Sequence, residues 1–241
     1  TGIYPQGFKQ IFKVTLSDRR QTECCAEHLW RVMYRDWSEP RVINTERLIE
    51  MLSCARYKNR LWVDNISGDF GHDRELPIHP WVLGALLGDG TLALSHSSVM
   101  FSTKSPELVD RINMLAGYEM ELVHANAYDW RLVSKERIAA NGQRVAVKTN
   151  YFRAALDELG VLGCRSFDKF IPSLYLEAGK ASRLALFQGL MDTDGWIEKW
   201  GSIRFCTSSK QLSEDVASLA RSLGGFCSIS QKQSSYTYKG E

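Results

Sequence analysis

The stretch Val82–Gly90 reads VLGALLGDG, and the stretch Phe187–Gly195 reads FQGLMDTDG. Each is a short apolar segment with a small residue at every fourth position, and each ends in Asp-Gly. Small residues four apart share one face of a helix and let two helix backbones approach closely. The two segments therefore predict a pair of helices that pack through their small residues. These residues are Gly84 and Gly88 in the first copy, and Ala185, Gly189 and Thr193 in the second.

Such packing would bring Asp89 and Asp194 out side by side at the same end of the helix pair. Two carboxylates so close repel each other unless a cation lies between them. This predicts a divalent metal site, and oxygen ligands favour magnesium. Taken singly, each aspartate is more simply explained as a carboxylate that ends a helix. The terminal Gly90 and Gly195 predict left-handed helix caps.

The sequence downstream of each motif also matches. Phe101–Leu108 reads FSTKSPEL, and Phe205–Leu212 reads FCTSSKQL. A repeat with the same order of motif and flank indicates two related parts of one chain. Asp89 and Asp194 then occupy equivalent places in these parts, which favours the metal site over two unrelated helix ends.

The two motifs with their matched flanks resemble the LAGLIDADG (dodecapeptide) homing endonucleases that are embedded in inteins. The first copy departs from the family name at Leu87 and Gly88. The resemblance covers residues 79–241 and implies an α+β fold with two pseudo-symmetric αββαββα halves, 79–165 and 166–241, each with a curved sheet over DNA. It also implies that Asp89 and Asp194 bind a catalytic Mg²⁺, that the partner is double-stranded DNA with a long target site, and that one chain acts as a monomer.

The expected elements fit that order. Ser105 is expected to start a helix with Pro106 at its first position, and 119–125 with 128–134 read as a strand pair. In the second half we expect a helix over 211–223, a strand over 226–230 and the start of a last strand at 236–239.

The segment before the second motif reads SFDKFIP over Ser166–Pro172. It resembles intein block D, which places Lys169 at the active-site lysine of the family. A lysine near the scissile phosphate offsets the charge that develops on phosphorus. The simpler alternative is a surface lysine before a helix-starting proline.

The resemblance to inteins implies that the first 70 residues form part of a β-rich splicing (Hint) domain. Residues 8–16 read as a strand and 45–55 as an amphipathic helix capped by Thr45. The segment around Cys25 and His28 resembles intein block B, which implies that His28 polarises the upstream splice junction, with Cys25 in place of the usual threonine. A lone histidine after a strand is more often structural. The first and last residues lack the splice-junction residues of inteins, so we expect a fragment whose exteins, the host protein, lie in cis.

Composition bounds the function only loosely. The net charge is +2 and 24% of the residues are charged, so the chain is not a conspicuous polyanion binder. There is no apolar run long enough for a membrane span and no signal peptide, which favours a cytoplasmic, nucleoid-associated protein. One segment is unusually basic and is expected to follow a DNA backbone, with a merely solvated loop as the equal alternative. Its bases are Arg131, Lys135, Arg137, Arg144 and Lys148.

The sequence thus predicts a metal-dependent, site-specific DNA endonuclease within a protein-splicing element. Two alternatives remain open. One is a LAGLIDADG protein that binds DNA without cleaving it, and the other is an intein that only splices and whose nuclease has decayed.

Overall fold

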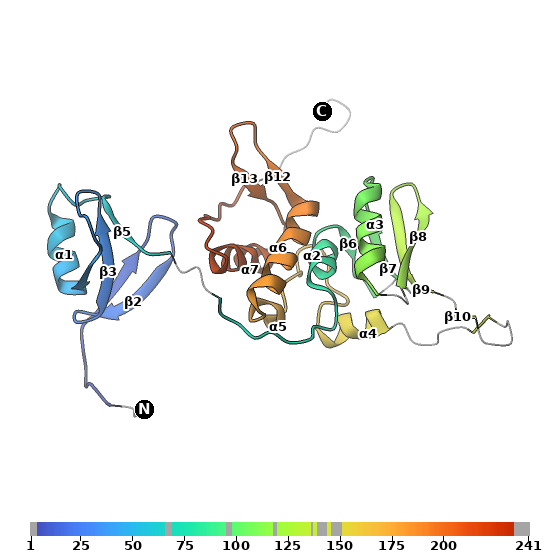
Figure 1. Cartoon of the computed structure of the whole chain (residues 1–241), viewed down its shortest axis with the longest axis horizontal. Coiled ribbons are helices and arrows are strands. Elements are labelled where there is room, and N and C mark those ends of the chain that lie inside the picture. Colours follow the sequence, from blue (N-terminus) through green and yellow to red (C-terminus); the bar gives the residue numbers. More distant parts are fainter. Residues whose placement is uncertain are drawn as a thin grey trace. The chain divides into compact units, whose positions relative to one another are not determined.

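The computed structural model describes residues 4–65, 69–94, 98–117, 120–135, 137–138, 144–145 and 151–233, and of 137–138, 144–145 and 151 only the backbone. The chain divides into two compact units. The N-terminal unit holds the residues up to 66 together with Phe226–Ser228, and the C-terminal unit holds the rest. Helices and antiparallel sheets are mixed, so the fold class is α+β (Figure 1).

The N-terminal unit consists of a hairpin, a three-stranded sheet and one helix. The hairpin pairs β1 (Ile11–Thr15) with β2 (Gln21–Cys25). The sheet has the order β4-β3-β5, with strands at Leu29–Tyr34 (β3), Arg41–Asn44 (β4) and Leu61–Val63 (β5). Helix α1 (Thr45–Ser53) follows β4 and buries Leu48 and Met51.

The expected cap of helix α1 is wrong by one residue. Asn44 is the N-cap, and its side chain accepts from the Arg47 amide at 2.9 Å. The Thr45 hydroxyl is buried and instead accepts from Trp30 Nε1 at 2.9 Å. Because Thr45 faces the core, its side chain is not available to cap the helix.

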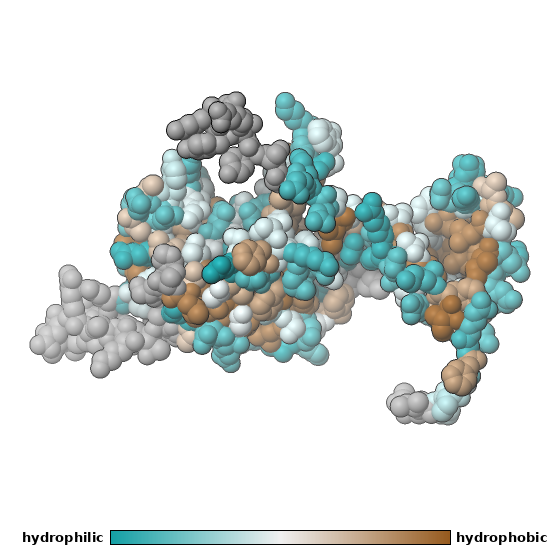
Figure 2. Space-filling view, turned by 180° about the vertical axis from the view of Figure 1, so that it is seen from behind, coloured by the Kyte–Doolittle hydropathy of each residue, from teal (hydrophilic) through white to brown (hydrophobic). Residues whose placement is uncertain are grey.

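One face of the three-stranded sheet exposes large apolar side chains. Leu29, Val42 and Trp62 are 64%, 63% and 52% exposed. Residues paired across neighbouring strands point to the same face, and Val42 pairs with Arg31 while Trp62 pairs with Met33. Figure 2 shows apolar surface gathered on this unit.

The C-terminal unit begins with helix α2 (Pro80–Asp89), which continues directly into strand β6 (Gly90–Thr91). Strand β7 (Val99–Ser102), helix α3 (Pro106–Leu115), strands β8 (Met120–Asn126) and β9 (Asp129–Ser134), and helix α4 (Tyr151–Glu158) follow. The sheet has the order β6-β7-β9-β8 (Figure 1). A short pair, β10 (Arg137–Ile138) with β11 (Arg144–Val145), lies between β9 and α4. Apart from this short pair, the order of helices and strands over this part is the one expected for the first half.

The second motif repeats the local structure of the first. After α5 (Ser173–Leu176), helix α6 (Lys180–Asp194) runs into β12 (Gly195–Ile197), which pairs with β13 (Ile203–Phe205). The register is the same in both copies, because Gly90 pairs with Phe101 and Gly195 pairs with Phe205.

The capping of the next helix is also repeated. Ser105 caps α3 by accepting from Leu108 N, and Ser209 caps α7 (Lys210–Ser222) by accepting from Leu212 N. A serine at this place satisfies one of the amides that the first helical turn leaves without a partner.

The strand expected over 226–230 is wrong. Residues 226–233 form no strand, and Phe226 is 67% exposed. A strand needs a hydrogen-bonded neighbour, and the expected partner at 236–239 lies outside the described residues. The arrangement in two complete halves therefore stays a prediction.

The core of the C-terminal unit forms where the two motif helices meet the sheet. Helix α2 is buried from Pro80 to Leu87, and Leu186 and Leu190 of α6 are fully buried against it. Of the helices described, none is both long enough and apolar enough to cross a membrane.

Candidate active site at the paired motif helices

Helices α2 and α6 pack backbone against backbone through their glycines. A Cβ on Gly84 would lie 2.3 Å from the Leu186 carbonyl oxygen, and a Cβ on Gly189 would lie 2.1 Å from the Trp81 carbonyl oxygen. One turn further on, a Cβ on Gly88 would lie 2.0 Å from Thr193 Oγ1. The contacts advance in the same direction along both helices, so the helices are parallel and end together. The expected packing through small residues is confirmed at these positions.

The glycines that end the two helices serve close approach rather than a left-handed turn. Gly90 has φ −81° and Gly195 has φ −98°, both extended, so the predicted left-handed caps are wrong. A Cβ would lie 2.3 Å from the Leu86 carbonyl oxygen at Gly90 and 2.4 Å from the Met191 carbonyl oxygen at Gly195. Each helix therefore turns straight into its strand at a place where no side chain fits.

The parallel packing puts Asp89 and Asp194 together at the shared end. Asp194 Oδ2 lies 3.4 Å from the place where a Gly88 Cβ would be. Burial raises the pKa of both carboxyls, and the negative charge of Asp89 raises the pKa of Asp194 further. Lys169 opposes both shifts. The two carboxylates thus repel each other in a half-buried place.

This donor set fits a divalent cation. A cation between two carboxylates removes the repulsion that raises the pKa of Asp194. Within the described residues there is no group of three or more His, Cys, Asp or Glu side chains that could hold a metal. Mg²⁺ keeps several waters and binds through one or two carboxylates together with phosphate oxygens. Two carboxylates match the usual protein contribution to a magnesium site but are a poor set for a fully protein-bound ion.

The buried charge predicts a pH-dependent stability. The pKa of Asp194 is raised in the folded protein. Between the ordinary carboxyl pKa of about 4 and this raised pKa, the folded chain holds a proton that the unfolded chain has lost, so folding takes up a proton. Stability is then lost as the pH rises through the folded pKa. We expect Asp194→Asn to be more stable than the wild type at pH 7 in chelator. The gain should be no more than about 1 kcal/mol, because solvent partly screens the charge of a half-buried group.

Urea unfolding at pH 7 and pH 3 measures this effect. The advantage of the Asp194→Asn variant should vanish at pH 3, where both proteins are uncharged at this position. An advantage that is equal at both pH values would mean that the carboxylate charge is not its cause.

Lys169 binds the end of helix α2. Its ammonium is buried and donates to the carbonyls of Gly88 and Gly90, each at 2.8 Å, and to that of Leu86 at 3.4 Å. Its own carbonyl accepts from Ser209 Oγ, the cap of α7, at 2.6 Å. Burial lowers the pKa of Lys169, although both aspartates act against this. All three donors are used on backbone, so the structure shows a lysine that positions the end of the helix. A direct catalytic role stays a prediction.

Removing this ammonium should destabilise the C-terminal unit. In Lys169→Met, buried carbonyls at the end of α2 lose their donor, which costs about 2–3 kcal/mol. Lys199→Met, at an exposed lysine, is the matched control and should stay within about 0.5 kcal/mol of the wild type. Urea midpoints compare the two variants. Equal midpoints would show that Lys169 does not support the helix end.

A cluster that sequence reasoning missed ties α2, α6 and α3 together. Asp192 Oδ2 accepts from Trp81 Nε1 at 2.9 Å and from Arg111 Nη1 at 3.2 Å. The Arg111 guanidinium lies over the Trp81 ring, 4.3 Å from its centroid. Asp192 lies two positions before Asp194, the last residue of α6, so this contact fixes the register of the helices close to the carboxylates. Its members are far apart in sequence, and no spacing signal could have found them.

The residues predicted for splicing lie in the N-terminal unit. Cys25 ends β2, and its carbonyl accepts from the His28 amide at 3.2 Å, so one tight turn joins the two residues. The His28 ring is exposed and packs edge-on against Trp30, with centroids 4.9 Å apart. The His28 carbonyl accepts from the Thr45 amide at 3.0 Å. The geometry is that of a fixed turn with an accessible imidazole, and the splicing roles stay predictions.

The structure describes only some of the basic residues that are predicted to bind DNA. Arg131 is exposed on β9, opposite Met100 of β7 and Val123 of β8, and Lys135 directly follows β9. The backbones of Arg137 and Arg144 lie in the β10–β11 pair, but their side chains lie outside the described residues, as does the whole of Lys148. Contact of these five residues with DNA stays a prediction.

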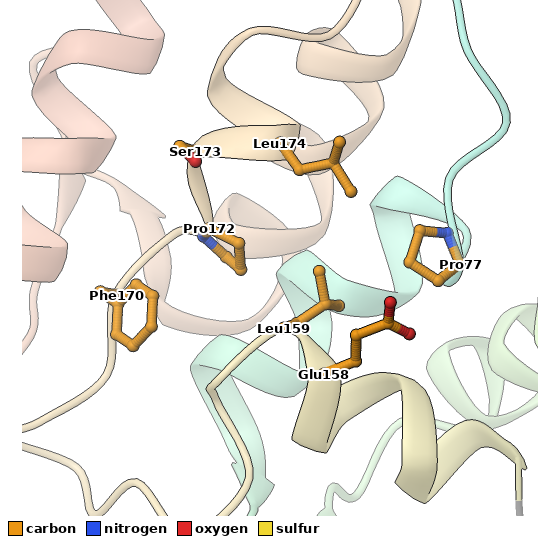
Figure 3. Close-up of a pocket in the computed structure, with 7 residues that line it drawn as sticks. All are labelled: Pro77, Glu158, Leu159, Phe170, Pro172, Ser173 and Leu174. Atoms are coloured by element: carbon orange, nitrogen blue, oxygen red, sulfur yellow. The ribbon is translucent and has the colours of Figure 1, made fainter.

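A groove of about 320 Å³ lies apart from the carboxylates, between the end of α4 and the segment that leads into α5 (Figure 3). Apolar side chains line it, with Glu158 as its one acid among the described residues. A single carboxylate without a second titratable group offers no acid–base pair. The lining of the groove consists of Pro77, Glu158, Leu159, Phe170, Pro172, Ser173 and Leu174.

Comparison with known families identifies the second motif. Residues 181–240 match the model of the LAGLIDADG-like domain. This match begins in helix α6 and includes Asp194 and the β12–β13 hairpin. This part of the chain is thus similar to the LAGLIDADG-like domain.

Three relatives carry two different names. The chain is 32% identical over 161 residues to the replicative DNA helicase DnaB of Mycobacterium intracellulare and 30% identical over 155 residues to that of Synechocystis. It is also 33% identical over 152 residues to the iron-sulfur cluster assembly SufBD family protein ML0593 of Mycobacterium leprae. These matches cover 67%, 59% and 60% of this chain. The chain spans only 22%, 17% and 15% of the relatives' lengths.

Proposed function

We propose that this chain is a site-specific endonuclease that hydrolyses one phosphodiester in each strand of double-stranded DNA, with Mg²⁺ as its cofactor. The observation that carries the proposal is the close parallel packing of α2 and α6, which places Asp89 and Asp194 together at one end. That the second of these helices belongs to a LAGLIDADG-like domain supports DNA as the substrate.

The chain's own residues would hold the metal and fix its surroundings. Asp89 and Asp194 would supply the carboxylate ligands, and Lys169 would hold the end of α2 so that Asp89 stays in place. Bound Mg²⁺ stabilises negative charge on a phosphate oxygen and lowers the pKa of a coordinated water. The Trp81–Asp192–Arg111 cluster would keep the two carboxylates at a constant separation.

The internal repeat supports a chain that acts as a monomer on a long target site. Both motifs lie in one chain with hairpins of the same register, so two related surfaces are available without a second copy. Arg131, Lys135 and the other bases after β9 would add contacts to the phosphate backbone.

We further propose that the nuclease lies within an intein. The relatives carry two unrelated names, yet each matches this chain over no more than 22% of its own length. A segment shared by otherwise different proteins is expected of an inserted element. The N-terminal unit would then be part of the splicing domain, with His28 and Cys25 at the upstream junction and the host exteins in cis.

One experiment tests the nuclease. The protein is incubated with Mg²⁺ and DNA of the surrounding gene from which this chain's coding segment has been deleted, and the new ends are sequenced. Double-strand cuts at one locus beside the deletion support the proposal. Specific binding without cuts would favour a non-cleaving DNA-binding protein or a splicing-only intein, and would overturn the nuclease.

A further inference from the structure

One end of the three-stranded sheet in the N-terminal unit gathers arginines, a lysine and aromatic rings. Strand β3 ends at Tyr34, while β4 begins at Arg41 and β5 at Leu61, on either side of it. Because both neighbours are antiparallel to β3, their first residues lie at the same end of the sheet as Tyr34. We call this region the basic end. It consists of Tyr34, Arg35, Trp37, Arg41, Arg56, Tyr57, Lys58 and Arg60.

Aromatic rings hold two of the guanidinium groups. Arg41 lies 4.3 Å from the centroid of Trp37, and Arg56 lies 5.5 Å from that of Tyr34 and 5.6 Å from that of Tyr57. The Tyr34 ring meets Trp37 and Tyr57 edge-on, at 5.9 Å and 5.0 Å. A guanidinium that stacks on a ring keeps its N–H edge available for an anion and loses less entropy on binding.

The charges of the basic end are poorly neutralised. Residues 34–41 and 54–60 carry five basic side chains and two acidic ones, Asp36 and Glu39. Asp36 pairs with Arg35 and Arg56. Within the described part of the chain, Arg41, Lys58 and Arg60 are exposed and have no ion pair.

Most other cations of this unit are neutralised by an acid. Lys9 pairs with Glu27, Arg20 with Asp18, Arg31 with Asp64 and Arg47 with Glu50. Lys13 and Arg19 on the β1–β2 hairpin also form no ion pair within the described residues. Unlike Arg41 and Arg56, however, they stack on no aromatic ring of those residues. The basic end is therefore distinct in combining surplus charge with a rigid aromatic support.

We infer that the basic end binds the phosphate backbone of duplex DNA, as a contact additional to the carboxylate site. This inference rests on the proposed function, because it assumes that DNA is the partner of the chain. Unpaired arginine and lysine side chains release counterions from DNA and add affinity that does not depend on sequence. The basic end thus raises affinity, whereas recognition of the target is left to the C-terminal unit.

The side chains present favour DNA over an anionic membrane. Binding at a membrane interface needs large apolar side chains that project beside the bases. In the basic end Tyr34 is buried, and Trp37 and Tyr57 are partly buried beneath the guanidinium groups. Trp62 pairs with Met33, and the side chains of Met33 and Tyr34 point to opposite faces because they are neighbours in one strand. The exposed Trp62 therefore lies on the face opposite to Tyr34.

Salt-dependent binding of the whole chain to a short duplex of arbitrary sequence tests the inference. The variant Arg41→Gln/Lys58→Gln/Arg60→Gln is compared with Lys9→Gln/Lys13→Gln/Arg47→Gln, which removes the same charge from the same unit. All six side chains are on the surface, and thermal unfolding checks that both variants fold. Fluorescence anisotropy gives Kd at several KCl concentrations.

We expect the first variant to lose at least tenfold in affinity at 50 mM salt. The slope of log K against log salt should fall by up to about 3, because three cations are removed and each phosphate contact contributes about 0.9. The control should lose no more than about twofold, because its sites make no phosphate contact. Equal losses in both variants would overturn the inference while leaving the nuclease intact, provided the wild type still binds and cuts DNA.

Two other outcomes also decide the matter. A wild type that binds no duplex would remove the proposed function and this inference together. Unchanged duplex binding by the first variant, with loss of binding to vesicles containing anionic lipid, would assign the basic end to a membrane surface and overturn the inference.

Discussion

Gly189→Val is expected to unfold the C-terminal unit or to destabilise it by about 3 kcal/mol or more. A Cβ at this position would lie 2.1 Å from the Trp81 carbonyl oxygen and 2.9 Å from the Ala85 amide nitrogen. Both are backbone atoms of α2, which cannot rotate away as a side chain does. The helices would have to separate, and Leu186 and Leu190 would lose their packing in the core.

Urea unfolding followed by circular dichroism measures this loss, with Gly201→Ala as the control. Gly201 has φ +86° and no atom within 4 Å of an added Cβ, so its substitution costs about 1–2 kcal/mol through backbone strain alone. A Gly189→Val protein as stable as the Gly201→Ala protein would contradict the close packing of α2 and α6.

Asp89→Asn and Asp194→Asn should each reduce DNA cleavage by at least about 100-fold while DNA affinity changes by no more than a few-fold. An amide keeps the size of the side chain but loses the charge that holds a divalent cation, and a metal ion provides several kcal/mol of charge stabilisation in hydrolysis. Neutral asparagines also remove the repulsion between the carboxylates, so folding is not the expected cause of lost activity.

Asp168→Asn is the matched control for charge. Asp168 is exposed beside Lys169 but contributes no ligand at the end of the helix pair. The Asp168→Asn variant should cleave DNA at the wild-type rate. If Asp194→Asn retained cleavage at the control's rate, Asp194 would have no part in the reaction.

The parts of the fold that the sequence predicted are those that follow from a pattern within a short stretch of residues. Small residues at every fourth position predicted the approach of α2 to α6, because only glycine fits between the backbones at Gly84 and Gly189. The order Ser105-Pro106 predicted the start of α3, because a serine cap and an N1 proline act within one turn. The strands β8 and β9 followed from alternation over a short stretch with a tight turn.

The misplaced features depend on surroundings that the residue type alone does not encode. Asp-Gly at a helix end signals a left-handed cap, yet Gly90 and Gly195 are extended, and each leads directly into a strand. Thr45 is a good cap by type, but Trp30 takes its hydroxyl into the core.

Lys169 shows the same limit within the candidate site. Its motif resemblance pointed to the scissile phosphate, whereas its ammonium is used by three carbonyls of a helix end about 80 residues earlier in the chain. Side-chain direction is decided by packing, which a motif does not encode. The same reason hid the Trp81–Asp192–Arg111 cluster, which joins three helices.

The most direct test of the account is the rate at which the wild-type protein linearises a plasmid that carries the uninterrupted gene locus, in Mg²⁺ and again after chelation, with Asp194→Asn beside it. We predict linear product that depends on Mg²⁺, stops with chelator and is lost in the variant. Linear product that persists in chelator, or that the Asp194→Asn variant forms at the wild-type rate, would contradict a magnesium site at the paired motif helices.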